Sequence, residues 1–200
     1  RVLFRSQAAT RLRVLGTTDI AAFAPLLEAF AAAVPKLRVE YEQWSSNALF
    51  VEAAAACGRD AAVADLIVSS AVDQQVRLVN DGCARPHVSV ATAALPPEMN
   101  WRNELFGVTR EPAVIVYNRD AVPEAEAPRS RFDLIDLLRP EHGSYVGRVA
   151  TYDIESSGLG YLFAFADSQA ATTFGSLLEA LSRSRAEATC CSREILDGIA

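Results

Sequence analysis

Residues 12–19 read LRVLGTTD, a short apolar strand pattern that ends in a polar loop. Apolar side chains then recur at helical spacing, with Thr18 or Asp19 as the N-cap residue and Pro35 as the stop. These side chains are Ile20, Phe23, Leu26, Leu27, Phe30 and Val34. Because proline fits the first turn of a helix and disrupts its interior, we expect the main helix to begin at Pro25. The stretch predicts one strand–loop–helix unit.

Two further units of the same kind follow. Residues 37–42 alternate apolar and charged side chains, which predicts a half-buried strand, and Ser45 precedes a helix predicted over 47–57. The sequence ADLIV at 64–68 is typical of a strand buried in a parallel sheet, and a helix is predicted over 72–80. Three such units in succession predict an α/β fold with a parallel sheet.

The periodicity fails between residues 83 and 105, where we place a connection. Beyond it the patterns predict strands at 113–117 and 149–152 and helices at 132–138, 158–166, 170–182 and 192–199. We divide the chain into an artefact or tail at 1–10, a first lobe at 11–95, a crossover or hinge region at 96–118 and a second lobe at 119–200.

Composition excludes several classes of partner. Half of the 200 residues are hydrophobic and 22% are charged, which predicts a folded globular chain. The net charge is −6, and no run of Lys or Arg is present, so neither nucleic acid nor anionic lipid is an expected partner. No apolar run approaches the length of about 18 residues that a membrane span needs.

The two ends of the chain are interpreted as incomplete. The sequence does not start with Met, and its first six residues, RVLFRS, are what translation of a common sequencing adapter gives. We therefore expect a fragment that lacks its N-terminal signal peptide and its C-terminal segment.

The four cysteines, Cys57, Cys83, Cys190 and Cys191, lack Cys-x-x-Cys spacing, which disfavours a zinc site. In an oxidising compartment a bridge between Cys57 and Cys83 is conceivable. Unpaired, buried thiols are an equally weighted alternative.

Three loops between a strand and a helix combine small hydroxyl side chains with a helix start. In parallel α/β sheets, ligands sit beyond the carboxyl ends of the strands, at such loops. Capping of the following helix is the alternative role for each hydroxyl or carboxylate. The candidate ligand-binding residues in these loops are Thr17, Thr18, Asp19, Ser69, Ser70, Ser156 and Ser157.

Tyr117 and Asn118 are further candidates, because a phenol and an amide at the end of a predicted strand can hydrogen-bond a ligand. A half-buried Tyr beside a turn-forming Asn is the alternative. Arg110 could pair with an anionic ligand or lie on the surface. No nucleophile with a partnered base is evident, and no catalytic residue is assigned.

The order and spacing of these segments resemble the type II periplasmic solute-binding proteins of ABC importers, and within them the ferric-iron-binding branch. The resemblance rests on residues 12–19 with the Pro25–Phe30 segment, on 64–71, on Tyr117 with Asn118, and on the Ser156 loop. It covers most of residues 12–200.

The resemblance implies two α/β lobes, each with a mostly parallel sheet, joined by a hinge. It also implies a periplasmic or other extracytoplasmic, monomeric binder that is not an enzyme and has no cofactor. Its partners would be a membrane permease and a solute held in an interlobe cleft, either a small polar molecule or ferric iron. No metal ligand is assigned, since Cys190-Cys191 stands in the region where paired tyrosines are expected.

Two alternatives stay open. A sensor module of a signalling system would bind the same kind of ligand on the same fold. An enzyme on this fold would require a reactive cysteine, which rapid modification by a thiol reagent would reveal.

Overall fold

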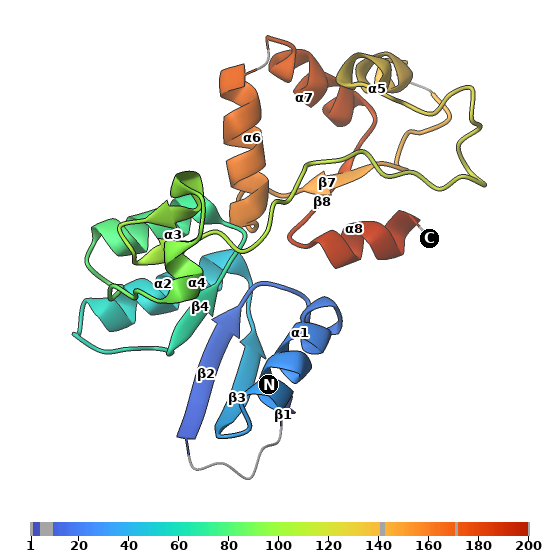
Figure 1. The fold of residues 1–200 in the computed structure, drawn as a ribbon. Coiled ribbons are helices and arrows are strands. Elements are labelled where there is room, and N and C mark those ends of the chain that lie inside the picture. Colours follow the sequence, from blue (N-terminus) through green and yellow to red (C-terminus); the bar gives the residue numbers. More distant parts are fainter. Residues whose placement is uncertain (1, 5–9, 141–142, 171, 200) are drawn as a thin grey trace. The chain divides into compact units, whose positions relative to one another are not determined.

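The computed structural model describes residues 2–4, 10–140, 143–170 and 172–199, and it divides the chain into two compact units (Figure 1). Unit 1 is Arg1–Glu111 and unit 2 is Pro112–Ala200. The division falls inside the predicted crossover region, 96–118. The artefact or tail predicted at 1–10 lies partly outside the described residues, although Val2–Phe4 forms strand β1.

A four-stranded sheet organises unit 1, with the strand order β1-β3-β2-β4. Strand β2 pairs in parallel with β3 on one side and β4 on the other, while β1 pairs antiparallel with β3. The strands are β2 (Thr10–Gly16), β3 (Leu37–Gln43) and β4 (Leu66–Val68), together with β1. The parallel α/β layer predicted from three strand–loop–helix units is confirmed.

Helix α1 (Ile20–Ala33) covers one face of this sheet (Figure 1). Because side chains alternate along a strand, Val14 of β2 and Val39 and Tyr41 of β3 point to the same face, where they pack with Leu27 of α1. The ring of Phe23 meets that of Tyr41 edge-on, with ring centroids 5.3 Å apart. This cluster is the core of unit 1.

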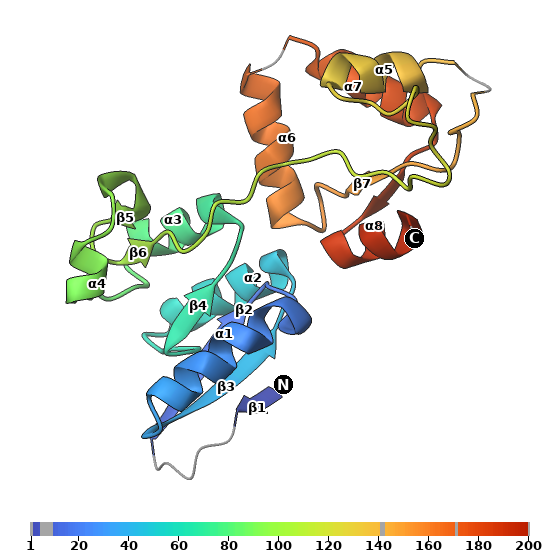
Figure 2. The same ribbon diagram turned by 45° about the vertical axis from the view of Figure 1, so that its right-hand side comes forward.

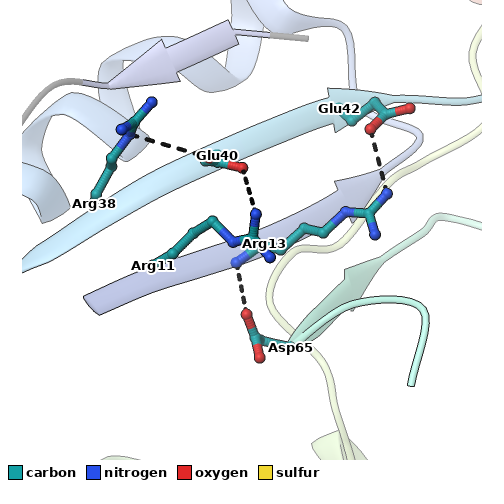
Figure 3. A network of polar contacts seen from close by, with 6 residues as sticks. All are labelled: Arg11, Arg13, Arg38, Glu40, Glu42 and Asp65. Carbon is teal, nitrogen blue, oxygen red and sulfur yellow. Dashed lines mark hydrogen bonds and ion pairs between the residues drawn. The ribbon is translucent and has the colours of Figure 1, made fainter. Parts of the chain in front are cut away.

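Charged side chains of β2 and β3 lie on the opposite face (Figure 3). Glu40 is only 5% exposed, and its carboxylate lies 3.7 Å from the guanidinium groups of both Arg11 and Arg38. Arg13 pairs with Glu42 at 3.6 Å, and its backbone N–H donates to Asp65. A buried carboxylate needs such cations nearby, so the alternation seen in the sequence gives one apolar face and one ion-paired face.

The rest of unit 1 consists of short elements. They are α2 (Ser46–Cys57), α3 (Val72–Asn80), α4 (Val90–Ala93), the 3-10 helix η1 (Pro97–Met99), and the hairpin strands β5 (Asn100–Trp101) and β6 (Leu105–Phe106). Ser45 is the N-cap of α2, as predicted, and accepts from Ala48 N. Helix α4, η1 and the hairpin lie where the sequence predicted only an irregular connection.

Unit 2 contains a two-stranded parallel sheet of β7 (Ala150–Tyr152) and β8 (Glu187–Thr189). Its helices are α5 (Arg131–Leu138), α6 (Gly158–Ala170), α7 (Phe174–Arg183) and α8 (Ser192–Ile199). Helices α5 and α7 lie side by side (Figure 2), and Ile135, Leu138 and Ala180 form the buried core between them.

Two predictions from the sequence are wrong. Helix α1 begins at Ile20, not Pro25, because Asp19 caps it by accepting from Ala21 N at 2.8 Å. Pro25 is then tolerated inside the helix at the loss of one backbone hydrogen bond. The segment 113–117 forms no strand, because no described segment pairs with it, and Val114 is 71% exposed.

Two disulfides are present among the described residues. Cys57, at the end of α2, is bonded to Cys83, just beyond α3, as conceived for an oxidising compartment. Cys190 is bonded to its neighbour Cys191, which was not predicted. Within the described part of the chain, no helix has the length and apolar character needed to cross a membrane.

We expect removal of each of the two disulfides to lower the free energy of unfolding by very different amounts. The Cys57–Cys83 bond spans 26 residues, so its removal in C57S/C83S releases chain entropy in the unfolded state and lowers the free energy of unfolding by about 3 kcal/mol. The Cys190–Cys191 bond spans one residue and closes almost no loop. Urea unfolding of C57S/C83S, with C190S/C191S as the matched control, measures the difference. Equal losses in the two variants would contradict the loop-closure account.

Candidate functional site

Three loops of unit 1 meet at the carboxyl edge of its parallel strands. Thr17, after β2, donates its backbone N–H to Val68 O at 3.0 Å, and Ser70, after β4, donates to Thr17 Oγ1 at 3.3 Å. Trp44, after β3, donates its backbone N–H to Gly16 O at 2.9 Å. We call residues 16–19, 43–46 and 69–71 the unit 1 loop cluster. The fold therefore brings Thr17 and Ser70, two of the predicted residues, into contact.

Tyr41 holds the first of these loops in place. Its hydroxyl donates to Thr18 O at 2.6 Å, and its ring occupies the space beside Gly16, where a Cβ would lie 2.8 Å from the phenol oxygen. Any side chain at position 16 would therefore displace the tyrosine. Burial, and to a lesser extent the negative charge of Asp19, raise the pKa of Tyr41 to about 12.

Several of the predicted residues in unit 1 have structural roles. Asp19 caps α1, as the capping alternative predicts, whereas Ser69 Oγ accepts from Ala71 N at 3.2 Å in the turn before α3 and does not cap that helix, whose N-cap residue is Ala71. Thr17 Oγ1 is an acceptor towards Ser70, which leaves its hydroxyl hydrogen to donate to a ligand. Thr18 contributes its backbone carbonyl to the Tyr41 bond.

Polar side chains that the sequence did not single out lie in or beside the same loops. Trp44 Nε1 is buried and has no hydrogen-bond partner within the described residues. In the first turn of α3, Gln74 donates to Asn47 Oδ1 at 2.7 Å, while its own Oε1 is buried without a described partner. An unpaired buried donor is costly, and a ligand acceptor would satisfy it. The position of Trp44 directly after a parallel strand was the signal that could have identified it.

Unit 2 has its own loop cluster at the carboxyl edge of β7 and β8. Asp153 donates its backbone N–H to Thr189 O at 2.7 Å, and the hydroxyls of Tyr152 and Ser192 lie 2.7 Å apart. Hydrogen bonds from Glu155 N and then from the Ser156 hydroxyl lower the pKa of Asp153. The carboxylate therefore stays charged and organises the loop.

The predicted residues of unit 2 are placed as follows. Ser156 donates to Asp153 at 2.9 Å, and Ser157, only 4% exposed, accepts from Gly160 N at 3.0 Å. Asn118 forms a turn by accepting from Asp120 N, and its amide also donates to Ile199 O. Tyr117 lies in an irregular segment. A direct ligand contact by these residues stays a prediction.

Arg110 belongs to unit 1 and lies on its surface. Its guanidinium is 3.5 Å from the Glu98 carboxylate, and its side chain is 78% exposed. Surface exposure was the alternative that the sequence left open.

Comparison with known proteins gives a family match and several solved structures with similar folds. A family model described as bacterial extracellular solute-binding protein matches residues 16–183. No curated protein matches the chain in sequence.

Solved structures give the same fold. A substrate-binding protein of an ABC transporter from Agrobacterium tumefaciens is 31% identical, with a TM-score of 0.94 over 99% of this chain and 60% of its own. The ferric iron-binding protein A of Mannheimia haemolytica is 19% identical, with a TM-score of 0.56 over 96% of this chain and 58% of its own. A two-component system protein that mediates signal transduction is 12% identical, with a TM-score of 0.58 over 96% of this chain and 60% of its own. The chain thus spans about 60% of the length of the first of these proteins.

We expect the stability difference between the wild type and Tyr41→Phe to depend on pH. Tyr41→Phe removes the bond to Thr18 O and lowers the free energy of unfolding by about 1 kcal/mol at pH 8. Because folding raises the tyrosine pKa from 10.0 to about 12, the stabilisation is complete below pH 10 and is lost as the pH rises towards 12. Urea unfolding of both proteins from pH 8 to 12 measures this difference. A constant difference across that range would contradict the assignment.

Proposed function

We propose that this chain, which belongs to the bacterial extracellular solute-binding protein family, captures a small polar solute outside the cytoplasm for an ABC importer. The membership supports a role in binding rather than catalysis. The permease partner and the extracytoplasmic location are part of the proposal. The similarity to an ABC transporter substrate-binding protein of Agrobacterium tumefaciens supports the link to import.

The observation that carries the proposal is the unit 1 loop cluster. Backbone hydrogen bonds fix its three loops at one edge of the sheet, where Thr17 retains a hydroxyl hydrogen and Trp44 an unpaired indole N–H. Polar groups held in place by preformed loops are typical of small-molecule sites, and a ligand acceptor that reaches the buried Trp44 N–H would satisfy it. The cluster is therefore proposed as one surface that contacts the solute.

The charge of this cluster suggests the class of solute. Residues 16–19, 43–46 and 69–71 contain no Lys or Arg, and the carboxylate of Asp19 already caps α1. A multiply charged anion would find no side-chain cation in these loops. We therefore propose an uncharged or weakly charged polar solute that offers hydrogen-bond acceptors to Thr17 and Trp44.

Ferric iron is the second proposed cargo, because one structure with this fold is a ferric iron-binding protein. Fe³⁺ requires hard oxygen ligands. Among the described residues, the one group of at least three His, Cys, Asp or Glu with suitably close ligand atoms is Cys190, Cys191 and Glu194, which is rich in sulfur. The donor set therefore favours the polar solute over iron.

A ligand-sensing role is the alternative of a different class, since a signal-transduction protein shares the fold. Both roles require the same binding step. They differ in the partner, which is a permease for an importer and a receptor or kinase for a sensor.

A ligand screen followed by tryptophan variants tests the proposed site and solute class. A thermal-shift screen of the protein against sugars, amides, small carboxylates, phosphate and Fe³⁺ with citrate identifies the class, because binding to the native state raises the melting temperature. For the best ligand, Trp44→Phe removes the indole N–H and keeps most of the aromatic surface, so we expect calorimetric affinity to fall by roughly tenfold, about 1.4 kcal/mol.

Trp101→Phe is the matched control, since Trp101 lies in the β5–β6 hairpin and is 49% exposed. It should bind as the wild type does. Equal effects of the two substitutions, or a response to Fe³⁺ alone, would refute the proposed site and solute class.

A further inference from the structure

The loop after β8 in unit 2 carries two sulfur atoms and a carboxylate side by side. Cys190 and Cys191 are joined by a disulfide, and Glu194 lies in the first turn of α8. Both carboxylate oxygens of Glu194 are 3.9 Å from Cys190 Sγ. The two sulfurs and a Glu194 oxygen all lie within 4.8 Å of one another.

We propose that Cys190, Cys191 and Glu194 form a redox-gated site for a thiophilic divalent cation such as Zn²⁺ or Cd²⁺. With the disulfide intact, the sulfur atoms are bonded to each other and are poor ligands. Once the disulfide is reduced, two thiolates and one carboxylate provide three ligands, and water completes a tetrahedral shell, as zinc prefers. Thiolate ligands select such ions over Mg²⁺ or Ca²⁺.

A dithiol is the reductant that opens the Cys190–Cys191 disulfide. The Cys190–Cys191 bond takes up two electrons and two protons and becomes two thiols, while the dithiol loses the same and becomes a disulfide. Binding of the cation then releases the two thiol protons. In the reverse exchange, an oxidised dithiol takes up two electrons from the thiolates and two protons from water, the Cys190–Cys191 disulfide forms again and the ion is released.

The surrounding loop holds the ligands in position. Thr189 Oγ1 accepts from Cys191 N and donates to Cys191 O, which fixes the backbone between the two sulfurs. The contact between Ser192 and Tyr152 anchors the start of α8 to β7. The N-terminal end of α8 also favours negative charge on the thiolates and on Glu194.

The second cysteine pair provides an internal contrast. Cys57 and Cys83 also form a disulfide, yet no group of three possible metal ligands includes them within the described residues. The inference does not rest on the proposed solute, because a different set of residues and a different measurement are involved.

Cadmium titration tests the proposal, because thiolate ligation of Cd²⁺ gives an ultraviolet charge-transfer band. The C57S/C83S variant, whose only cysteines are Cys190 and Cys191, is reduced with dithiothreitol, desalted without oxygen and titrated with Cd²⁺. We expect one equivalent to bind with the band in the reduced variant, and no band in the same variant when it is oxidised. The proposal is overturned if the reduced variant shows no band, or if the oxidised variant shows the same band.

The carboxylate is tested separately. Glu194→Gln should weaken Cd²⁺ binding by about 10–100-fold, the loss that removal of even a supporting group of a metal site causes. Asp197→Asn is the matched control, since Asp197 is an exposed carboxylate on the same helix that pairs with Arg193. Equal affinities of the two variants would show that Glu194 is not a ligand and would overturn the three-ligand site.

Discussion

The parallel pairing of β2 with β3 and β4 is the constraint on which the unit 1 site depends. Parallel strands end at the same edge, so the loops after Gly16, Gln43 and Val68 must meet there. The contact between Gly16 and Tyr41 then sets the position of the first loop, because only a residue without a side chain leaves room for the buried phenol. The donors of the loop cluster are thus positioned by the core of the sheet.

Much of this arrangement could be predicted from local sequence. The alternation of apolar and charged side chains in β3 predicts its two faces, and Ser45 predicts the start of α2. The start of α1 was misplaced because the cap at Asp19 outweighs the preference of Pro25 for the first turn. The segment 113–117 was misassigned because its β-type composition cannot form a strand without a partner, and pairing depends on distant residues.

Non-local contacts also explain which parts of the site were missed. The unpaired indole of Trp44 and the Gln74–Asn47 bond depend on packing between segments far apart in the sequence. The Cys57–Cys83 bond depends on a distance that spacing alone cannot give. The hydroxyl loops were visible in the sequence, but whether each serine caps a helix or faces a ligand is a matter of geometry.

Amide hydrogen exchange measures directly whether the unit 1 loop cluster contacts the solute. The protein is compared with and without the solute that gives the largest thermal shift. We expect slower exchange at residues 16–19, 43–46 and 69–71, and unchanged exchange in the β5–β6 hairpin at residues 100–106, since bound ligand suppresses local opening. Protection confined to the hairpin, with none in the loop cluster, would contradict this contact.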